Sequence, residues 1–195
     1  MNTITATNNT PNKLHPHKLL MYIAIGSMTM MFAGWISAYM VRQAQGRWEH
    51  IHLPSAFYVS TIVILISSVT IFLAAKAHKN KKFGSYKLFL LASLILGIVF
   101  LISQYLGFTE MYNEMDIKLN GNNAAGEFTY VIPFVHGLHA VGGVIALIVV
   151  YISNVIKTKR NKYSNTGIQI AATYWHFVDA LWLFIFLFLL YNQQA

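Results

Sequence analysis

The stretch YWHFVDALWLF, residues 174–184, decides how this chain is organised. It lies in an apolar run from Ile170 to Tyr191, which is long enough to cross a bilayer because about 20 residues at 1.5 Å each span the roughly 30 Å hydrocarbon layer. Asp179 in this run is the only acidic residue in any hydrophobic segment of the sequence. A bare carboxylate near the bilayer centre costs at least ~2.5 kcal/mol. We therefore expect neighbouring groups to hydrogen-bond Asp179, or the carboxyl to be held neutral.

The composition is that of a membrane protein. Of the 195 residues, 56% are hydrophobic and 10% are charged, whereas a soluble domain carries about 25% charged residues. The absence of cysteine from the sequence excludes disulfides, Cys-ligated clusters, covalently attached c-type haem and a thiolate copper site. The net charge of +8 is better explained by membrane topology than by a nucleic-acid partner.

Four further apolar runs also have the length of membrane spans. We predict an all-α, polytopic membrane protein, a bundle of five transmembrane helices at about residues 18–41, 54–77, 86–108, 130–153 and 170–191. Residues 1–17 are polar and rich in Asn and Thr, so we expect a flexible N-terminal tail followed by one transmembrane domain, 18–195. The first run is too long for a signal peptide and lacks an obvious cleavage site, so we expect it to be retained.

The basic residues predict the orientation. If five helices alternate, three of the fourteen Lys and Arg residues fall on one side of the membrane and the rest on the other. The basic side contains the N-terminal tail, the loop near Lys79 and the loop near Arg160, and cytoplasmic loops are the ones enriched in Lys and Arg. The N-terminus is therefore expected in the cytoplasm and the C-terminus outside.

Small and aromatic side chains in the spans indicate packing surfaces. Small residues let transmembrane helices or lipids approach closely, and hydroxyl groups can hydrogen-bond across helices. The candidates for helix packing or lipid contact are Gly34, Ser67, Gly142, Gly143, Trp175 and Trp182.

Three histidines share the interior of the spans with Asp179. His136 and His139 are three residues apart and therefore lie on roughly one helix face. At 1.5 Å per residue, His139 lies about 13 Å and Asp179 about 16 Å below the outer edge of the hydrocarbon layer. We therefore predict a hydrogen bond between His139 and Asp179. His176 is expected about one turn nearer the cytoplasm.

Three roles compete for these buried groups. They could form a structural polar pair that fixes helix register, a proton or water relay, or part of a haem or metal site. Bis-His haem needs two histidines that face one another, and His139 and His176 are offset in depth. A carboxylate–histidine metal site lacks a clear third ligand. We therefore expect a helical membrane subunit with no complete catalytic, cofactor or metal site of its own.

A resemblance adds what these patterns leave open. The run Tyr174-Trp175-His176-Phe177-Val178-Asp179, followed by Trp182-Leu183-Phe184, resembles the final-helix signature of cytochrome c oxidase subunit III. The run His136-Gly137-Leu138-His139-Ala140, followed by Gly142-Gly143, resembles the preceding helix of that family. Weaker matches at Phe32-Ala33-Gly34, Pro54, Gly97 and Gln104 occur in the family's order. The resemblance covers nearly all of residues 18–191 and is closest to the five-helix bacterial form, which lacks the first two of seven helices.

The resemblance implies an accessory subunit of a haem–copper oxygen reductase in a bacterial inner membrane. In that family, subunits I and II hold the haems and copper and pass electrons from cytochrome c to oxygen with proton translocation. Subunit III binds no metal. It binds phospholipid between its helices and supports proton uptake and the durability of subunit I. The implied partners are thus oxidase subunits I and II, membrane lipids and, indirectly, cytochrome c.

Two departures and two alternatives remain. Met28 stands where many family members have a buried Glu, and Gly107 where many have an acid, so the resemblance carries neither carboxylate's role to this chain. Pro133-Phe134 is a smaller deviation. The chain could instead be subunit III of a quinol oxidase. An independent proton-coupled transporter would require an internal repeat and a discontinuous helix, and the sequence shows neither pattern.

Overall fold

The part of the chain that the structure describes forms five long helices and one short π-helical turn. The structure is a computed structural model, and it describes residues 16–45, 52–113, 124–156 and 165–194. The elements are α1 (Pro16–Ala44), α2 (Ser55–Lys79), α3 (Phe83–Asn113), α4 (Ala124–Tyr151), η1 (Ile152–Ile156) and α5 (Asn165–Gln194). The described residues contain no strand, and the predicted all-α fold is confirmed.

All five helices are long and apolar enough to cross a membrane. The shortest, α2, has 25 residues and is therefore about 37 Å long. Most of the helices extend a few residues beyond the predicted spans, because a helix that leaves the hydrocarbon still satisfies its own backbone groups. The connection between the predicted spans 86–108 and 130–153 is shorter than those spans imply, because α3 continues to Asn113 and α4 begins at Ala124. Residues 114–123 lie outside the described ranges.

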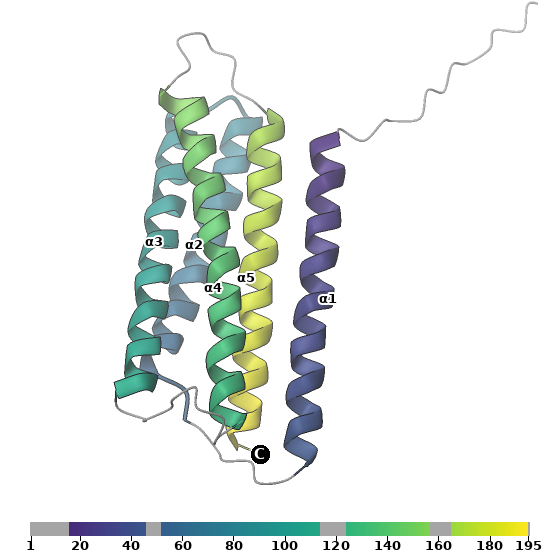
Figure 1. The fold of residues 1–195 in the computed structure, drawn as a ribbon. Coiled ribbons are helices and arrows are strands. Elements are labelled where there is room, and N and C mark those ends of the chain that lie inside the picture. Colours follow the sequence, from purple (N-terminus) through teal and green to yellow (C-terminus); the bar gives the residue numbers. More distant parts are fainter. Residues whose placement is uncertain (1–15, 46–51, 114–123, 157–164, 195) are drawn as a thin grey trace, which may run out of the picture.

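Four of the helices form a ring and the fifth stands beside it. Each of α2, α3, α4 and α5 packs against the next, and α5 closes on α2, while α1 contacts α4 and α5 (Figure 1). The start of α1 and the end of α5 lie at opposite ends of the bundle (Figure 1), as an odd number of spans requires. The ring encloses the core, and α1 covers one edge of it.

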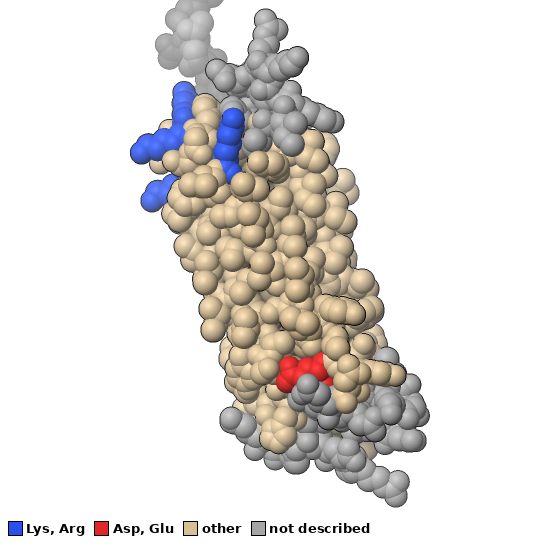
Figure 2. Space-filling model, turned by 90° about the vertical axis from the view of Figure 1, so that its left-hand side faces the viewer, with Lys and Arg blue, Asp and Glu red and all other residues tan. Residues whose placement is uncertain are grey.

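On the surface of the bundle, charged side chains lie near its ends (Figure 2), whereas Asp179 is buried in its interior. On the face drawn in Figure 2, Lys and Arg gather at one end, acidic residues lie near the other, and an uncharged band separates them. The described basic residues near the α2–α3 turn include Lys79, Lys81 and Lys82, which are all exposed. The uncharged band has the form expected for a surface in contact with hydrocarbon.

The core is built around two tryptophans of α5. Trp182 lies in a cluster with Phe57, Phe100 and Ile132, and Trp175 lies in a second cluster with Tyr86 and Leu147. Both indoles are 0% exposed. Because the two residues are seven apart, they lie on the same face of α5, two turns from one another. That face points into the ring.

Helices α2 and α3 are joined at both ends. At one end, a tight turn continues from α2, with the Asn80 N–H donating to the Lys76 carbonyl. At the other end, Glu110 of α3 accepts hydrogen bonds from the Ser55 backbone N–H at 3.0 Å and from its hydroxyl at 3.2 Å. Pro54, the residue that precedes α2, provides no side-chain cap. Glu110 therefore satisfies an N–H that the start of a helix leaves without an intrahelical partner.

Candidate functional site

Polar side chains in the interior link α2 to its neighbours. The Trp182 indole Nε1–H donates to Thr61 Oγ1 at 3.0 Å, and the Trp175 indole Nε1–H donates to Ser67 Oγ at 3.1 Å. On the α3 side, the Gln104 amide donates to Ser60 Oγ at 3.0 Å. Such interhelical hydrogen bonds replace the water that the hydrocarbon lacks. The hydroxyl residues of α2 therefore act as acceptors that fix how α3 and α5 rotate against it.

Three glycines make room for aromatic rings. A Cβ atom at Gly143 would lie 2.8 Å from ring carbons of Trp175, and a Cβ at Gly97 would lie 2.9 Å from another carbon of the same ring. The indole thus fills a socket between α3 and α4. At Gly107, a Cβ would collide with the ring of Phe57. Gly107 therefore has no room for a side chain.

His136 is enclosed by aromatic rings. It is 0% exposed, and its ring centroid lies 5.2 Å from that of Trp182, 6.1 Å from Phe100 and 6.4 Å from Phe32. Neither of its ring nitrogens has a hydrogen-bond partner within the described part of the chain. The surroundings of His136 are therefore those of a packed ring.

The predicted hydrogen bond between His139 and Asp179 is wrong. His139 Nδ1 is bonded to the Val135 carbonyl of its own helix at 2.8 Å, and its ring lies 5.8 Å from that of Phe32 on α1. Asp179 is 3% exposed, and among the described residues neither of its carboxyl oxygens has a hydrogen-bond partner. The two residues are similar in depth, but their side chains lie in different surroundings.

The polar neighbour of Asp179 belongs to α2. The Ser68 hydroxyl lies beside the Asp179 carboxyl, and it is bonded to His176 Nδ1 at 2.8 Å. His176 is half-buried. The structure therefore groups Asp179 with Ser68 and His176, across the contact between α5 and α2. We call these three residues the Asp179 group.

The three predicted histidines do not converge on one point. His136 faces aromatic rings, His139 bonds to its own helix, and His176 bonds to α2. Over the ranges that the structure describes, no three His, Cys, Asp or Glu residues gather as a potential metal site. The arrangement of these groups can hold helices in register or hold a proton, and it brings no paired ligands to a shared centre.

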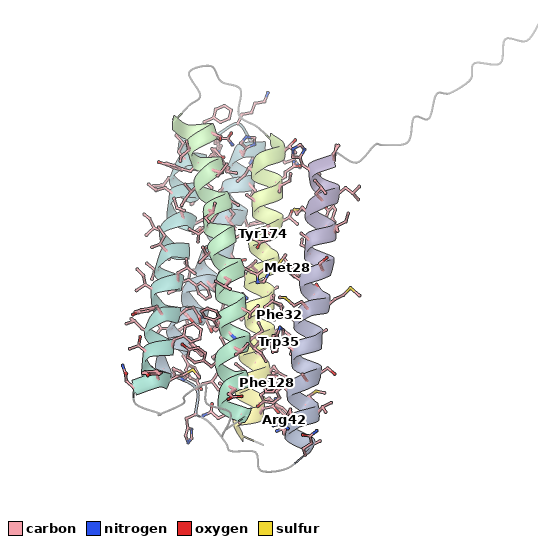
Figure 3. The ribbon with its side chains drawn as sticks, in the orientation of Figure 1. Met28, Phe32, Trp35, Arg42, Phe128 and Tyr174 are labelled. Carbon is pink, nitrogen blue, oxygen red and sulfur yellow. The ribbon has the colours of Figure 1, made fainter. Side chains whose placement is uncertain are left out.

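Helix α1 packs through one narrow side. Figure 3 labels Met28, Phe32 and Trp35 of α1, Phe128 of α4 and Tyr174 of α5, and the rings of Trp35 and Phe128 are 6.2 Å apart. Gly34 of α1, a candidate for helix packing or lipid contact, does not pack within the described chain, because a Cβ atom there would meet nothing within 4 Å. This side of α1 is not covered by the rest of the described chain.

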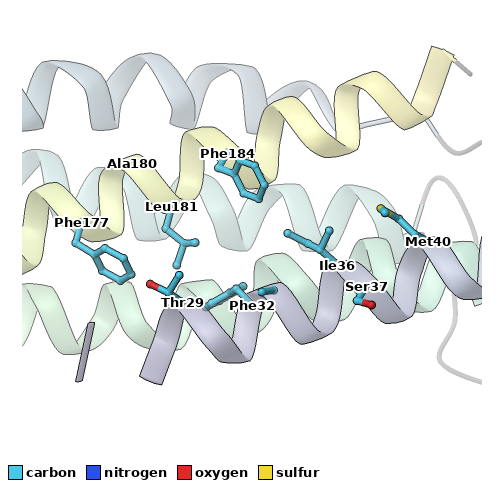
Figure 4. Close-up of a pocket in the computed structure, with 10 residues that line it drawn as sticks. Thr29, Phe32, Ile36, Ser37, Met40, Phe177, Ala180, Leu181 and Phe184 are labelled. Atoms are coloured by element: carbon cyan, nitrogen blue, oxygen red, sulfur yellow. The ribbon is translucent and has the colours of Figure 1, made fainter. Parts of the chain in front are cut away.

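Two apolar grooves flank α1. One, of about 600 Å³, lies against α4 and α5, and its lining includes Met21, Gly142 and Tyr174. The other, of about 550 Å³, lies between α1 and α5 and is lined by Thr29, Ala33, Ala180 and Phe184, among others (Figure 4). Of the predicted lipid or packing residues, Gly142 therefore lines a groove, whereas Gly143, Ser67, Trp175 and Trp182 belong to the interior.

Several residues of this interior were missed as site residues in the sequence. Phe32 and Phe100 enclose His136, Gly97 forms half of the Trp175 socket, and Ser68 is the polar group beside Asp179. A glycine in the middle of an apolar helix signals a close approach, so Gly97 carried a readable signal. The aromatic residues that enclose His136 carried no such signal, because aromatic residues are frequent throughout these spans.

Comparisons with known proteins agree with this architecture. A family model described as cytochrome c oxidase subunit III matches residues 48–194. Over 169 residues, the chain is 26% identical to cytochrome c oxidase subunit 3 of Bacillus subtilis, with 85% of this chain and 81% of the relative covered. It is 29% identical over 174 residues to the protein of the same name from Corynebacterium diphtheriae, covering 84% and 82%.

A relative named probable cytochrome c oxidase subunit 3, from Rickettsia prowazekii, is 33% identical over 136 residues. There the match covers 67% of this chain but only 46% of the relative. The family match includes α2 to α5, and with them the Trp175 socket and the Asp179 group. Because that match extends over well more than half of the sequence, this chain of five apolar helices belongs to the cytochrome c oxidase subunit III family.

Proposed function

We propose that this chain is the accessory, non-catalytic subunit III of a proton-translocating cytochrome c oxidase in a bacterial inner membrane. In this proposal, subunits I and II carry the haems and copper and receive electrons from cytochrome c. This chain binds none of these groups. It binds phospholipid, and it supports proton uptake by the catalytic subunit and the stability of that subunit.

The observation that carries the proposal is how the interior polar groups are used. The indoles of Trp175 and Trp182 and the Gln104 amide bond to hydroxyls of α2, and the predicted histidines face separate surroundings. A haem held by two histidines requires both imidazoles at one iron. Interior groups that join helices in this way support a role as scaffold and partner.

We place the N-terminus in the cytoplasm and the C-terminus outside. The exposed Lys79, Lys81 and Lys82 near the α2–α3 turn lie at the same end of the bundle as the start of α1. Short basic loops remain on the cytoplasmic side of a membrane. Glu110 lies at the opposite end, next to the start of α2.

The groove of about 600 Å³ is our candidate lipid site. Its lining is apolar and includes Met21, Gly142, Ala146 and Val149. Lys18 lies at the neighbouring polar pocket, where its ammonium donates to Gln169 Oε1 at 2.7 Å. An acyl chain would fill the groove while a phosphate headgroup meets the basic end, because cationic side chains near the cytoplasmic surface attract anionic lipid.

A proton relay is a second role for the Asp179 group. The observation in its favour is a nearly buried carboxyl beside a hydroxyl that is itself bonded to an imidazole. Intramembrane carboxyl and histidine groups of this kind serve as relays in other membrane proteins. In the proposed accessory subunit, such a relay would assist proton uptake and would not be required for every turnover.

The direct test of the proposal is purification of the chain from its own membranes in mild detergent, with a haem absorption spectrum of the product. We expect a complex with subunits I and II that shows haem absorption. The copper ligands of the co-purified subunit II would distinguish a cytochrome c oxidase from a quinol oxidase. Isolation of the chain as a working unit with no companion would contradict the proposal.

Asp179→Asn provides the functional test. We expect the intact complex to perform its first turnovers at close to the normal rate and then to lose activity or to dissociate faster than the unmodified complex. The reason is that the variant changes a group inside the accessory subunit and leaves the metal centres in the partners unchanged. Oxygen consumption followed over many turnovers measures both phases. Loss of the first turnovers in an assembled complex would overturn the accessory role.

The structure disfavours an independent transporter. Such proteins often bind substrate at a helix that is broken near the middle of the membrane. The five spans described here are continuous, and α4 runs unbroken through Pro133.

A further inference from the structure

The outward side of α5 differs from an ordinary lipid-facing helix surface. Residues three or four apart share one side of a helix, and such a series runs along α5 between its contacts with α1 and α2. All of its members are exposed except the half-buried His176. We call this series the α5 outer stripe: Gln169, Thr173, His176, Ala180, Phe184 and Leu187.

The outer side of α3 provides the contrast. From Leu88 to Ile102, its exposed residues are all large and aliphatic, and they include Leu91, Ile95 and Ile98. Tyr105, which is 70% exposed, follows them. The aliphatic side chains need no hydrogen-bond partner, and the acyl chains of lipids supply the apolar contact. The first four residues of the α5 outer stripe instead present an amide, a hydroxyl, an imidazole and a methyl group. Small and hydrogen-bonding side chains are typical of interfaces between transmembrane helices.

His176 makes this contrast specific. It lies about 16 Å from the start of a helix that is about 45 Å long, and so it lies inside the hydrocarbon layer, in the half nearer the start of α5. One ring nitrogen, Nδ1, is bonded to Ser68. The other, Nε2, is not enclosed by the described part of the chain. It therefore opens to the surface of the bundle. In either tautomer, Nε2 is a hydrogen-bond donor or acceptor, and hydrocarbon offers it no partner.

Room for a partner exists beside the stripe. The groove between α1 and α5 has a volume of about 550 Å³, and Ala180 and Phe184 belong both to its lining and to the stripe (Figure 4). On its far side, the lining includes Thr29, Ala33 and Ser37 of α1. Side chains of a helix lying on the stripe could enter this groove. A lipid chain could fill the groove as well, but it would leave Nε2 of His176 without a hydrogen bond.

We propose that the α5 outer stripe is the surface on which a transmembrane helix of a companion oxidase subunit packs. That helix presents a hydrogen-bonding side chain to His176 inside the hydrocarbon layer, and small side chains opposite Ala180 allow close approach. This inference rests on the proposed function, because it requires a multi-subunit complex. It assigns the face of this subunit that meets the companion and leaves the outer face of α3 to lipid.

Cysteine crosslinking tests the surface directly, because the sequence contains no native cysteine. Thr173→Cys and Ala180→Cys place a thiol on the stripe, while Ile95→Cys and Ile102→Cys place one on the outer side of α3. Each thiol is labelled in native membranes with a photoreactive maleimide and illuminated, and the products are identified by mass spectrometry. We expect the two stripe positions to crosslink to a companion subunit with at least tenfold higher yield than the two α3 positions.

Three outcomes would overturn the inference. They are equal yields from the stripe and α3 positions, products with lipid alone, and products that join two copies of this chain. If the unmodified chain does not co-purify with haem-bearing companions, the proposed function itself fails. If it does co-purify but the stripe variants behave like the α3 variants, only the assignment of the face fails.

Substitutions at His176 test the hydrogen bond. We expect His176→Phe to lower the fraction of this chain that stays with the complex in mild detergent about tenfold, whereas His176→Gln, which keeps a donor and an acceptor, retains most of it. Ser68→Ala removes the internal bond without altering the stripe and should retain clearly more of the chain in the complex than His176→Phe does. Equal losses for Phe and Gln, or a loss for Ser68→Ala as large as that for Phe, would overturn the role of His176.

Discussion

Helices α1 and α5 are similar in length and both are apolar, but they are held in very different ways. The tyrosine, tryptophan and histidine side chains of α5 bond to α2 and α4, through Tyr174, Trp175, His176 and Trp182. In α1, by contrast, the hydroxyls of Ser27 and Thr29 bond to carbonyls of their own helix. Where lipid is as apolar as the protein, apolar side chains alone do not decide which helices associate.

The comparison shows what determines the fold inside the membrane. Shape and hydrogen bonding place α5, as at the glycines that receive Trp175 and at the hydroxyls that accept from the indoles. Helix α1 has four buried residues, Met21, Met28, Phe32 and Tyr39, along one narrow side. We therefore expect substitutions in the α5 contacts to damage the fold most, and substitutions in α1 to release that helix without unfolding the ring.

Gly143→Leu should have the largest effect. Its side chain would occupy the space of the Trp175 ring, which lies 2.8 Å from the position of a Cβ atom, and overpacking in a rigid interior costs about 3 kcal/mol. Thermal unfolding of the purified complex, followed by the loss of this chain, measures the change. Gly137→Leu is the matched control, because a Cβ there would meet nothing within 4 Å. Similar destabilisation by both variants would show that the socket is not rigid.

Phe32→Ala should come next and should affect α1 alone. Phe32 is 1% exposed and packs against His136 and His139. Because lipid can replace the lost apolar surface, we expect only the packing contribution to disappear, about 2 kcal/mol. Increased protease cleavage after α1, with the ring left intact, would report its release. Met30→Ala, at a 78% exposed position of the same helix, should change nothing. Unfolding of the whole ring in Phe32→Ala would contradict the separation of α1 from α2–α5.

A double-mutant cycle between Trp182 and Thr61 should show the smallest effect. Trp182→Phe removes the indole donor and Thr61→Val removes the acceptor, so the cycle isolates the hydrogen bond of 3.0 Å. Interhelical bonds in membranes couple by about 0.6 kcal/mol on average and by up to about 1.7 kcal/mol. Unfolding of the four variants in detergent gives this coupling. A value near zero would leave shape alone as the force that places α5.

The sequence was sufficient for the number of spans and not for their rotation. Each apolar run became a helix because its length matches the hydrocarbon layer. The depths of His139 and Asp179 also follow from the rise per residue. The direction of each side chain around its helix axis does not follow from the rise per residue. That direction is why the predicted bond between His139 and Asp179 is wrong: His139 bonds to Val135, and Asp179 lies beside Ser68. That rotation depends on ring-to-glycine contacts such as Trp175 with Gly97, which join segments far apart in the sequence.

The outer end of α3 was misread for a related reason. The predicted span ends at residue 108, but the helix continues to Asn113. Glu110 is held there by the start of α2, a partner 55 residues earlier in the chain. A local pattern does not reveal such a partner.

The two hydrogen bonds from Ser55 to the Glu110 carboxylate, which we call the Glu110 clasp, have a mechanical consequence. Helices α2 and α3 are joined by the chain at Asn80 and by two hydrogen bonds to one carboxylate at the other end. A pulling force applied through either terminus must therefore break the clasp before one helix can slide past the other. Helices α2 and α3 would then unfold together in one step, and the neutralising substitution Glu110→Gln would turn one rupture event into two weaker ones.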